Sequence, residues 1–323
     1  MAQTFALTTV TAGFDAKGFD LGDGSDGALQ FIAAGSTAVA GATLSSGVYT
    51  LTRDIFASAI TLDLGVTIKP AGYRIRCLGA ITNTPAILDK GFGVQTVWPV
   101  ISDNGNAAVT TTAGAALTAA GSLHRISMIG GAQAAPGTQG TAATWPSFGG
   151  FGGAGGSQSG HTDGGAQSAA PVQPTGIQAT AHELYFANYG ILNNSGNQGP
   201  QYLTGGAGGA GGAQGGSAGG SGGGGGGVIY IAAGSIVAGA GLGFTIEALG
   251  GAGGAGVANY GSGGGGGGGV LILATRAPVV SGSQYNGVYL NVNGGAAGAQ
   301  AGTATLASAG GAGTIFLFSP QAY

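Results

Sequence analysis

The chain has 323 residues, with 75 glycines but only 8 basic and 11 acidic side chains, and a net charge of −3. The absence of a basic patch argues against nucleic acid as a partner. A hydrophobic fraction of 43% with so few charges argues against disorder, and 10 prolines are too few for collagen. The sequence has no run of about 18 apolar residues, so we predict no transmembrane helix.

Residues 1–26 are predicted to form an irregular N-terminal arm that could attach the protein to a virion. Within it, DLGDGSDG places Asp20, Asp23 and Asp26 three residues apart. Calcium loops use more carboxylates and a bidentate Glu, so we favour a turn and leave ion binding open. The first residues lack both a basic segment and a continuous apolar segment, so we expect no secretory signal.

Residues 27–128 are predicted to form a domain of short β-strands. In YRIRCL, residues Tyr73, Ile75 and Cys77 alternate with Arg74 and Arg76, which predicts one apolar and one polar face. Strands this short, separated by glycines, predict a β-solenoid or a sandwich. The Ala/Thr/Gly-rich segment 103–121 is predicted to be a loop. The strand candidates are 28–34, 48–54, 58–64, 66–70, 73–82 and 122–130.

The segments DGSDG (23–27) and LTRDIFASAITLDLGVTIKPAGYRIRCLGAIT (51–82) resemble a module of bacteriophage structural proteins. The resemblance covers about 60 residues, in the order LTRD, strand, GVTI, GYRI, strand. It implies a right-handed β-helical coil on a virion component and no particular activity.

Residues 129–323 are predicted to form a glycine-rich repeat domain. From Thr204 to Ala213 every third residue is Ala or Thr and all others are glycine. A period of three fits neither an α-helix nor a strand, but it fits an extended helix with three residues per turn. We therefore predict packed polyglycine II helices, with the all-glycine runs 222–227 and 263–269 in the interior. A flexible linker is the alternative, but each run leads directly into an apolar strand.

An internal repeat runs through this region. The predicted strand starts Val228, Val270 and Thr314 are 42 and 44 residues apart, and the strands at Phe244 and Val288 are also 44 apart. Such periods are typical of stacked solenoids. The predicted fold class is therefore all-β, a β-solenoid or β-helix with packed polyglycine helices. The glycine region also resembles the polyglycine-sandwich tips of phage tail-fibre adhesins, which implies receptor binding by loops at the end of the bundle.

The sequence contains no convincing catalytic or metal constellation. His182-Glu183 is not followed by a second histidine at the zincin spacing, and only Asp163, Glu183 and Glu247 remain as acids beyond residue 125. We therefore expect no enzyme, cofactor or metal site.

The turns between glycine runs are the candidate ligand-binding loops, because their aromatic side chains offer contact area at low entropic cost. For any one aromatic residue, packing against the bundle is an equal alternative. The candidates are Trp145, Phe148, His161, Asp163, Tyr202 and Tyr260.

These features together predict a bacteriophage virion surface protein, assembled in the host cytoplasm. The first hypothesis is a tail-fibre or spike component that binds a host glycan or outer-membrane protein. A capsid-decorating or head-fibre protein and an ice-binding protein are the alternatives. Other virion proteins are the expected partners, and a homotrimer and a single chain both remain open.

Overall fold

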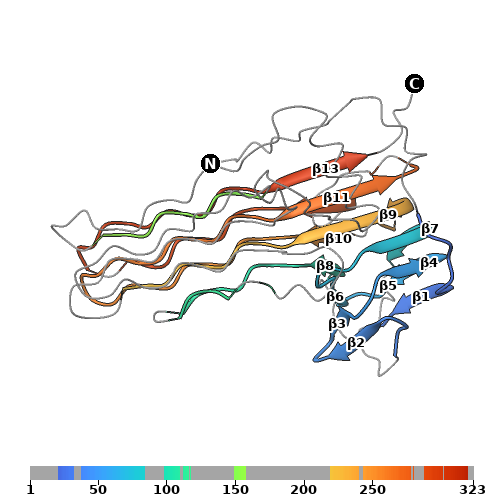
Figure 1. The fold of residues 1–323 in the computed structure, drawn as a ribbon, viewed down its shortest axis with the longest axis horizontal. Helices are drawn as coiled ribbons and strands as arrows, with labels where there is room; N and C mark the ends of the chain where they lie inside the picture. Colours follow the sequence, from blue (N-terminus) through green and yellow to red (C-terminus); the bar gives the residue numbers. More distant parts are fainter. Residues whose placement is uncertain are drawn as a thin grey trace, which may run out of the picture.

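The computed structural model describes residues 21–32, 38–83, 98–109, 112–115, 117, 149–157, 219–239, 243–277, 279, 287–300 and 302–318. Within these ranges the regular secondary structure is thirteen strands, with no helix. The same residues thus contain no helix with the length and hydrophobicity needed to cross a membrane. The strands occupy one end of the molecule, and long extended segments project from them (Figure 1).

The strands form two sheets, and nearly every pairing is parallel. The first sheet has the order β1-β5-β7-β9-β11-β13, with β4 also paired to β7, and the second has the order β12-β10-β8-β6-β3-β2. Among the thirteen described strands, only β2 and β3 pair antiparallel. The bounds are β1 (Ala28–Phe31), β2 (Ala42–Ser45), β3 (Val48–Leu51), β4 (Ile55–Ala57), β5 (Ala59–Leu62), β6 (Thr67–Lys69), β7 (Ile75–Asn83), β8 (Val100–Ser102), β9 (Val228–Val237), β10 (Gly243–Glu247), β11 (Val270–Thr275), β12 (Gly287–Asn291) and β13 (Thr314–Phe318).

The main core lies between the two sheets and uses the alternate side chains of each strand. Tyr49 and Phe31 meet there edge to face, with ring centroids 5.1 Å apart, and the Tyr49 hydroxyl donates to the Ile32 carbonyl (3.0 Å). A second apolar cluster on β9, β11 and β13 includes Tyr230, Ile272 and Phe316. Both faces of the first sheet are covered at β9 and β11, one by the main core and one by this second cluster. This explains why the sequences of β9 and β11 are continuous apolar runs.

Both sheets combine strands from the two predicted domains. Ile75 of β7 pairs with Ile231 of β9, and Val100 of β8 pairs with Thr245 of β10. The boundary predicted between residues 128 and 129 therefore falls between strands that share these sheets.

The predicted fold class, a β-solenoid or β-helix with packed polyglycine helices, is wrong. The strands form two separate parallel sheets and no closed solenoid within the described residues. The 44-residue repeat is real as a strand spacing, since β10 pairs with β12 and β11 with β13 at that offset. Each repeat nevertheless does not close a coil, because the chain leaves the sheets after β10 and returns only at β11 (Figure 1).

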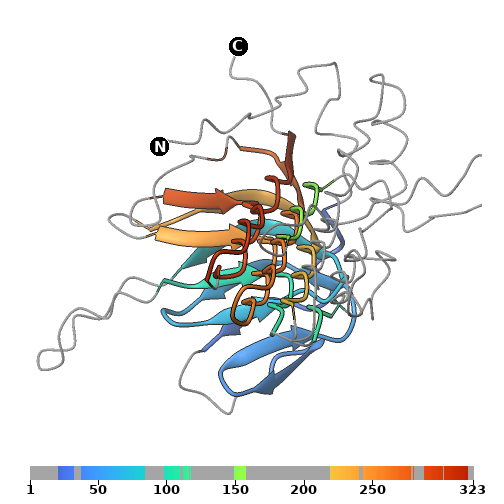
Figure 2. The same ribbon diagram turned by 90° about the vertical axis from the view of Figure 1, so that its left-hand side faces the viewer.

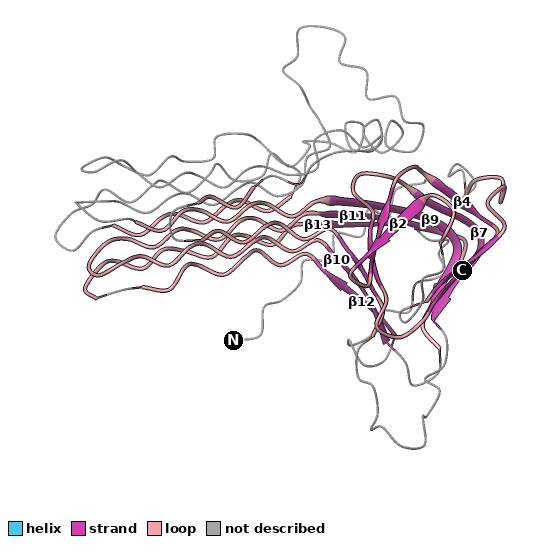
Figure 3. Cartoon of the chain, turned by 90° about the horizontal axis from the view of Figure 1, so that it is seen from below, coloured by secondary structure: helices cyan, strands magenta, loops and turns pink. Residues whose placement is uncertain are grey.

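The segments that leave the sheets are extended glycine-rich rows lying side by side (Figures 1 and 3). We call them glycine rows: 103–109, 149–157, 219–227, 248–256, 261–269, 292–300 and 304–313. Their backbones bond to one another, and the bonds recur at every third residue. The 219–227 row, for example, donates from Gly220 to Gly261, from Gly223 to Gly264 and from Gly226 to Gly267, with N···O distances of 2.9–3.0 Å.

The 261–269 row is the centre of this bundle and is surrounded by other rows (Figure 2). A Cβ on Gly263, Gly266 or Gly269 would lie 1.9–2.0 Å from a carbonyl oxygen of the 219–227 row. A Cβ on Gly264 or Gly267 would lie 1.9–2.2 Å from a carbonyl oxygen of the 149–157 row. A Cβ on Gly265 or Gly268 would lie 1.8–2.0 Å from a carbonyl oxygen of the 292–300 row. From Gly263 to Gly269 no side chain fits on any of the three faces, which explains this uninterrupted glycine run. Ser262, just before it, carries the only side chain of the row and is buried.

The segment 103–121, predicted to be a loop, begins with one of these rows. Gly105 N–H donates to the Leu249 carbonyl (2.7 Å) and Ala108 N–H to the Ala252 carbonyl (2.8 Å). The row then turns back early, with Val109 and Thr112 bonded to each other in both directions. The bundle therefore includes residues from before the predicted glycine-rich domain.

Candidate functional site

The end of the bundle farthest from the sheets is formed by the turns between outgoing and returning rows. Of the six predicted ligand-binding residues, Tyr260 lies in such a turn and is half-buried. Trp145, Phe148, His161, Asp163 and Tyr202 lie outside the described residues. The candidate site is therefore built from Tyr260 and its neighbours.

The turn 257–260 joins the 248–256 row to the 261–269 row. Tyr260 N–H donates to the Val257 carbonyl (3.1 Å), and Ala258 adopts a left-handed φ of 54°. The Val257 side chain is 45% exposed, and Ala258 and Asn259 are also exposed. Such a φ is unfavourable for alanine, so the surrounding hydrogen bonds hold this turn in shape.

A second turn lies next to the first, one repeat further along the chain. Gly302 has a φ of 62° and stands 44 residues after Ala258. The Asn259 side-chain oxygen accepts from the Thr303 N–H (3.2 Å), so the two turns are tied directly together. The Gln300 amide donates to the Ala304 carbonyl and closes the second turn.

Hydroxyl groups connect the rows close to this tip. The Ser157 and Thr305 hydroxyls lie 2.6 Å apart, and the Ser157 N–H donates to the Thr305 hydroxyl (2.6 Å). The Ser308 hydroxyl accepts from the Ala154 N–H (2.6 Å). Leu306 on the same row is 73% exposed. The tip thus presents apolar, amide and hydroxyl groups, and no charged residue lies in the turns 257–260 and 302–304.

Phe151 shows what an aromatic residue does on the flank of the bundle. A Cβ on Gly311 would lie 2.5 Å from the Phe151 ring, so the ring packs directly over that glycine. The Phe151 carbonyl also accepts from the Gly311 N–H (2.7 Å). At this position the packing role applies.

Two ion pairs join the DGSDG, LTRD and GYRI segments beside β4 and β7. Arg53 donates twice to the Asp26 carboxylate (2.9 and 2.5 Å), which also accepts from the Phe56 N–H (2.7 Å). The hydrogen bonds from the Arg53 side chain are the main reason that the pKa of Asp26 lies below its usual value, and the Phe56 N–H adds a smaller effect in the same direction. Asp54 accepts from the Arg74 backbone (2.8 Å) and guanidinium (3.2 Å).

As predicted, Tyr73, Ile75 and Cys77 face the main core and Arg74 and Arg76 do not, but the face that carries the two arginines is also buried. Burial lowers the pKa of Arg74, and the Asp54 charge opposes that shift. The Arg76 guanidinium lies 5.5 Å from the centre of the Phe56 ring. LTRD and GYRI therefore supply partners for one another, which is a structural role.

The aspartate turn at the N-terminal side gives no metal site among the residues described. Asp23 accepts from the Ser25 N–H (2.9 Å), which lowers the pKa of Asp23, and Asp26 is engaged by Arg53. Asp20 lies outside the described residues. No cluster of three or more His, Cys, Asp or Glu side chains occurs in the described part of the chain.

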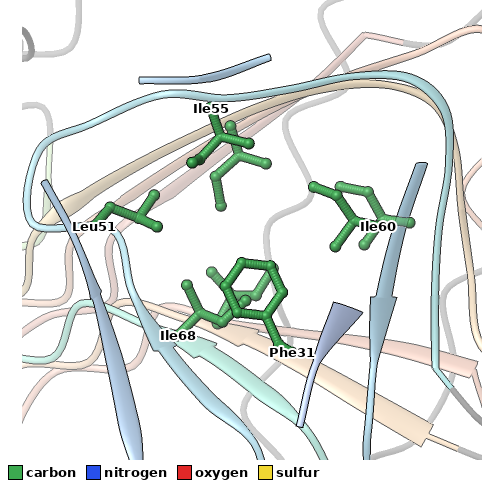
Figure 4. A pocket seen from close by; sticks show the side chains of 8 residues that line it. Phe31, Leu51, Ile55, Ile60 and Ile68 are labelled. Carbon is green, nitrogen blue, oxygen red and sulfur yellow. The ribbon is translucent and has the colours of Figure 1, made fainter. Parts of the chain in front are cut away.

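A small cavity between the sheets is apolar throughout (Figure 4). It offers about 10 Å³ to the centre of a water molecule, near the minimum for holding one, and it has no polar partner for that water. The cavity is therefore a packing gap. It is lined by Phe31, Leu51, Ile55, Ile60, Ile68, Ile75, Ile81 and Ile101.

Sequence reasoning missed Asn259, Gln300 and Thr303 at the tip. The signal was present, because the 44-residue offset that aligns Phe244 with Val288 also aligns Asn259 with Thr303. Comparison with known proteins adds no further assignment: no family model, curated protein or solved structure matches this chain.

Proposed function

We propose that the protein is a bacteriophage virion surface protein, a tail-fibre or spike component that binds the host cell surface through the turns at the tip of its glycine rows. The observation that carries the proposal is the projecting bundle itself (Figure 3). Its rows are joined by backbone bonds along their length, and it ends in turns with exposed side chains.

The bundle has the mechanical properties that display requires. Each row is bonded to several neighbours, and a row that bends must break buried backbone bonds, each costing about 1–3 kcal/mol if left unsatisfied. Glycine loses more backbone entropy on ordering than any other residue. A chain that orders so many glycines gains a stiff projection, which suits contact with a partner away from the particle.

The tip chemistry fits a host glycan or an outer-membrane protein. Tyr260 offers an aromatic ring, Asn259 and Thr303 offer polar groups, and Val257 is an exposed apolar contact. Aromatic rings with adjacent amides recognise neutral polar surfaces without needing charge complementarity. We expect binding without catalysis, and other virion proteins as partners at the opposite end.

The test is binding of labelled protein to a panel of bacterial strains, followed by polysaccharide purified from a strain that binds. Asn259→Ala combined with Tyr260→Ala should reduce binding at least tenfold. Ala309→Ser, an exposed change on the flank of the bundle, should leave binding unchanged. Failure of the wild-type protein to bind any strain that its phage infects would reject the receptor role. Gold labelling on the phage head would instead favour capsid decoration.

A further inference from the structure

Asp103 occupies the point where the first glycine row leaves the sheets. It follows β8 directly, and its N–H donates to the Glu247 carbonyl at the end of β10 (3.0 Å). Its carbonyl accepts from the Gly227 N–H (2.8 Å), the last residue before β9. One residue thus joins an outgoing row, a returning row and a strand end.

The Asp103 side chain is 0% exposed, and neither carboxyl oxygen has a hydrogen-bond partner among the described residues. The strand pairing shows what the other repeats place there. Ser102 pairs with Glu247, and Glu247 pairs with Asn291, so the next residues, Asp103, Ala248 and Val292, are equivalent. Ala248 and Val292 are buried apolar residues. The residue after β8 therefore carries a carboxyl group, whereas the equivalent residues after β10 and β12 carry hydrocarbon side chains.

The charged groups around this carboxyl do not neutralise it. Lys69, at the end of the neighbouring β6, attracts the carboxylate from a distance, but no ion pair joins the two. Glu247 of β10 is engaged by the Asn104 amide (2.7 Å). The 219–227 row has no titratable side chain. Burial raises the pKa of Asp103 to about 7, against the weaker opposing effect of Lys69.

We propose that Asp103 makes the junction between the sheets and the glycine rows sensitive to pH. With a neutral carboxyl the junction is closed and dry. When the carboxyl loses its proton, the buried charge requires hydration, and the 103–109 row separates from the rows beside it. The bonds at risk are those from Gly227 to Asp103, from Gly224 to Asn106 and from Ala108 to Ala252.

The sign of the effect follows from proton linkage. The folded protein holds a proton on Asp103 over a pH range in which the opened or unfolded chain has lost it, so the closed junction weakens as pH rises toward 7. If opening releases one proton, the open population rises by at most about tenfold per pH unit. Ordinary acid denaturation has the opposite sign, so the two are distinguishable. The inference does not depend on host binding.

The experiment is hydrogen exchange of the Gly224 and Gly227 amides between pH 5 and 9, corrected for the intrinsic exchange of the unfolded chain. The wild-type protein should show extra exchange that rises by at least tenfold between about pH 5 and pH 7 and levels off above the folded-state pKa of about 7. Asp103→Asn and Asp103→Val, the latter copying the residue at 292, should both lack this rise, whereas Glu247→Gln should keep it. A flat corrected profile in the wild-type protein overturns the proposal, whatever the variants do. An unchanged rise in either Asp103 variant also overturns it.

Discussion

Substitution of Gly266 by alanine tests the architecture of the bundle directly. Gly266 lies in the central row, its N–H donates to Gly251 (2.9 Å), and its carbonyl accepts from Gly295 (2.7 Å). A Cβ there would lie 2.0 Å from the Gly224 oxygen and 2.5 Å from the Gly224 carbonyl carbon. The rows must therefore separate by about 1 Å or more to reach the shortest contact that Cβ atoms make in real proteins.

The cost of that separation has two parts. Overpacking costs about 1–3 kcal/mol, and one or two buried backbone bonds left unsatisfied cost about 1–3 kcal/mol each. The lower entropy of the unfolded alanine chain offsets about 0.5–1 kcal/mol. We expect a net loss of about 1–8 kcal/mol, which can be a large fraction of the stability of a typical domain.

The assay is urea unfolding combined with amide exchange across the bundle. The matched control is Ala255→Ser, which also adds one heavy atom, but at an exposed position of the neighbouring row; its effect should stay within about 0.5 kcal/mol. Gly266→Ala should also accelerate amide exchange at Gly251 and Gly295. The Gly295 N–H donates to Gly266 itself, and the Gly251 N–H donates to the Gly224 carbonyl that the new Cβ would displace. Equal stability of the two variants would refute the close contact between backbones.

Three further predictions concern the turn, the ion pairs and the core. Ala258→Gly should stabilise the protein by about 0.5–1 kcal/mol in urea unfolding, because glycine adopts the left-handed φ of 54° without strain, as Gly302 already does; a loss of stability would contradict the strained turn. Asp26→Asn should cost about 0.5–1 kcal/mol at pH 7, a modest value because Arg53 is 45% exposed. Because the folded-state pKa of Asp26 is lowered, its contribution is present above its usual value of 3.8 and is lost as pH falls through the folded value, so the variant should lack this part of the acid unfolding curve. Ile68→Ala should cost about 3–5 kcal/mol by thermal or urea unfolding, because it enlarges an existing apolar cavity; a cost under 1 kcal/mol would mean that the sheets close around it.

The sequence predicts ten of the thirteen strands of the described region and misses β2, β4 and β8. The strands that follow glycine runs are the clearest, because the change from glycine to apolar residues marks where each begins. Strands predicted to start at Val228, Val270 and Thr314 start there in the structure. The interior position of 263–269 is readable for the same reason, since a run without any side chain has no face to expose.

The assignment of strands to sheets is not readable from the chain. β8 and β10 are separated by about 140 residues yet pair in parallel. The strands of both sheets are similarly short and apolar, so their sequences do not indicate to which sheet each belongs. The burial of Arg74 and Arg76 is hidden for another reason. Alternation marks them as polar, but their environment is set by Phe56 of β4 and by Asp54, which directly precedes β4. At the tip, the Asn259–Thr303 contact depends on the alignment of two repeats whose turn sequences differ.

The arrangement of strands and glycine rows also explains how rows with few side chains keep their alignment. Glycine-rich segments specify register weakly, because a slip by one triplet replaces each backbone bond with an equivalent one. The strands remove that freedom. β10 pairs with β12 at an offset of 44 residues, and the rows that continue them keep bonding with no slip, from Gly250 to Asn293 near the sheets to Gly256 to Ala299 near the tip. Apolar side chains in the sheets thus fix the position of turns many residues away, and the geometry at Asn259 and Tyr260 depends on core packing at the other end of the molecule.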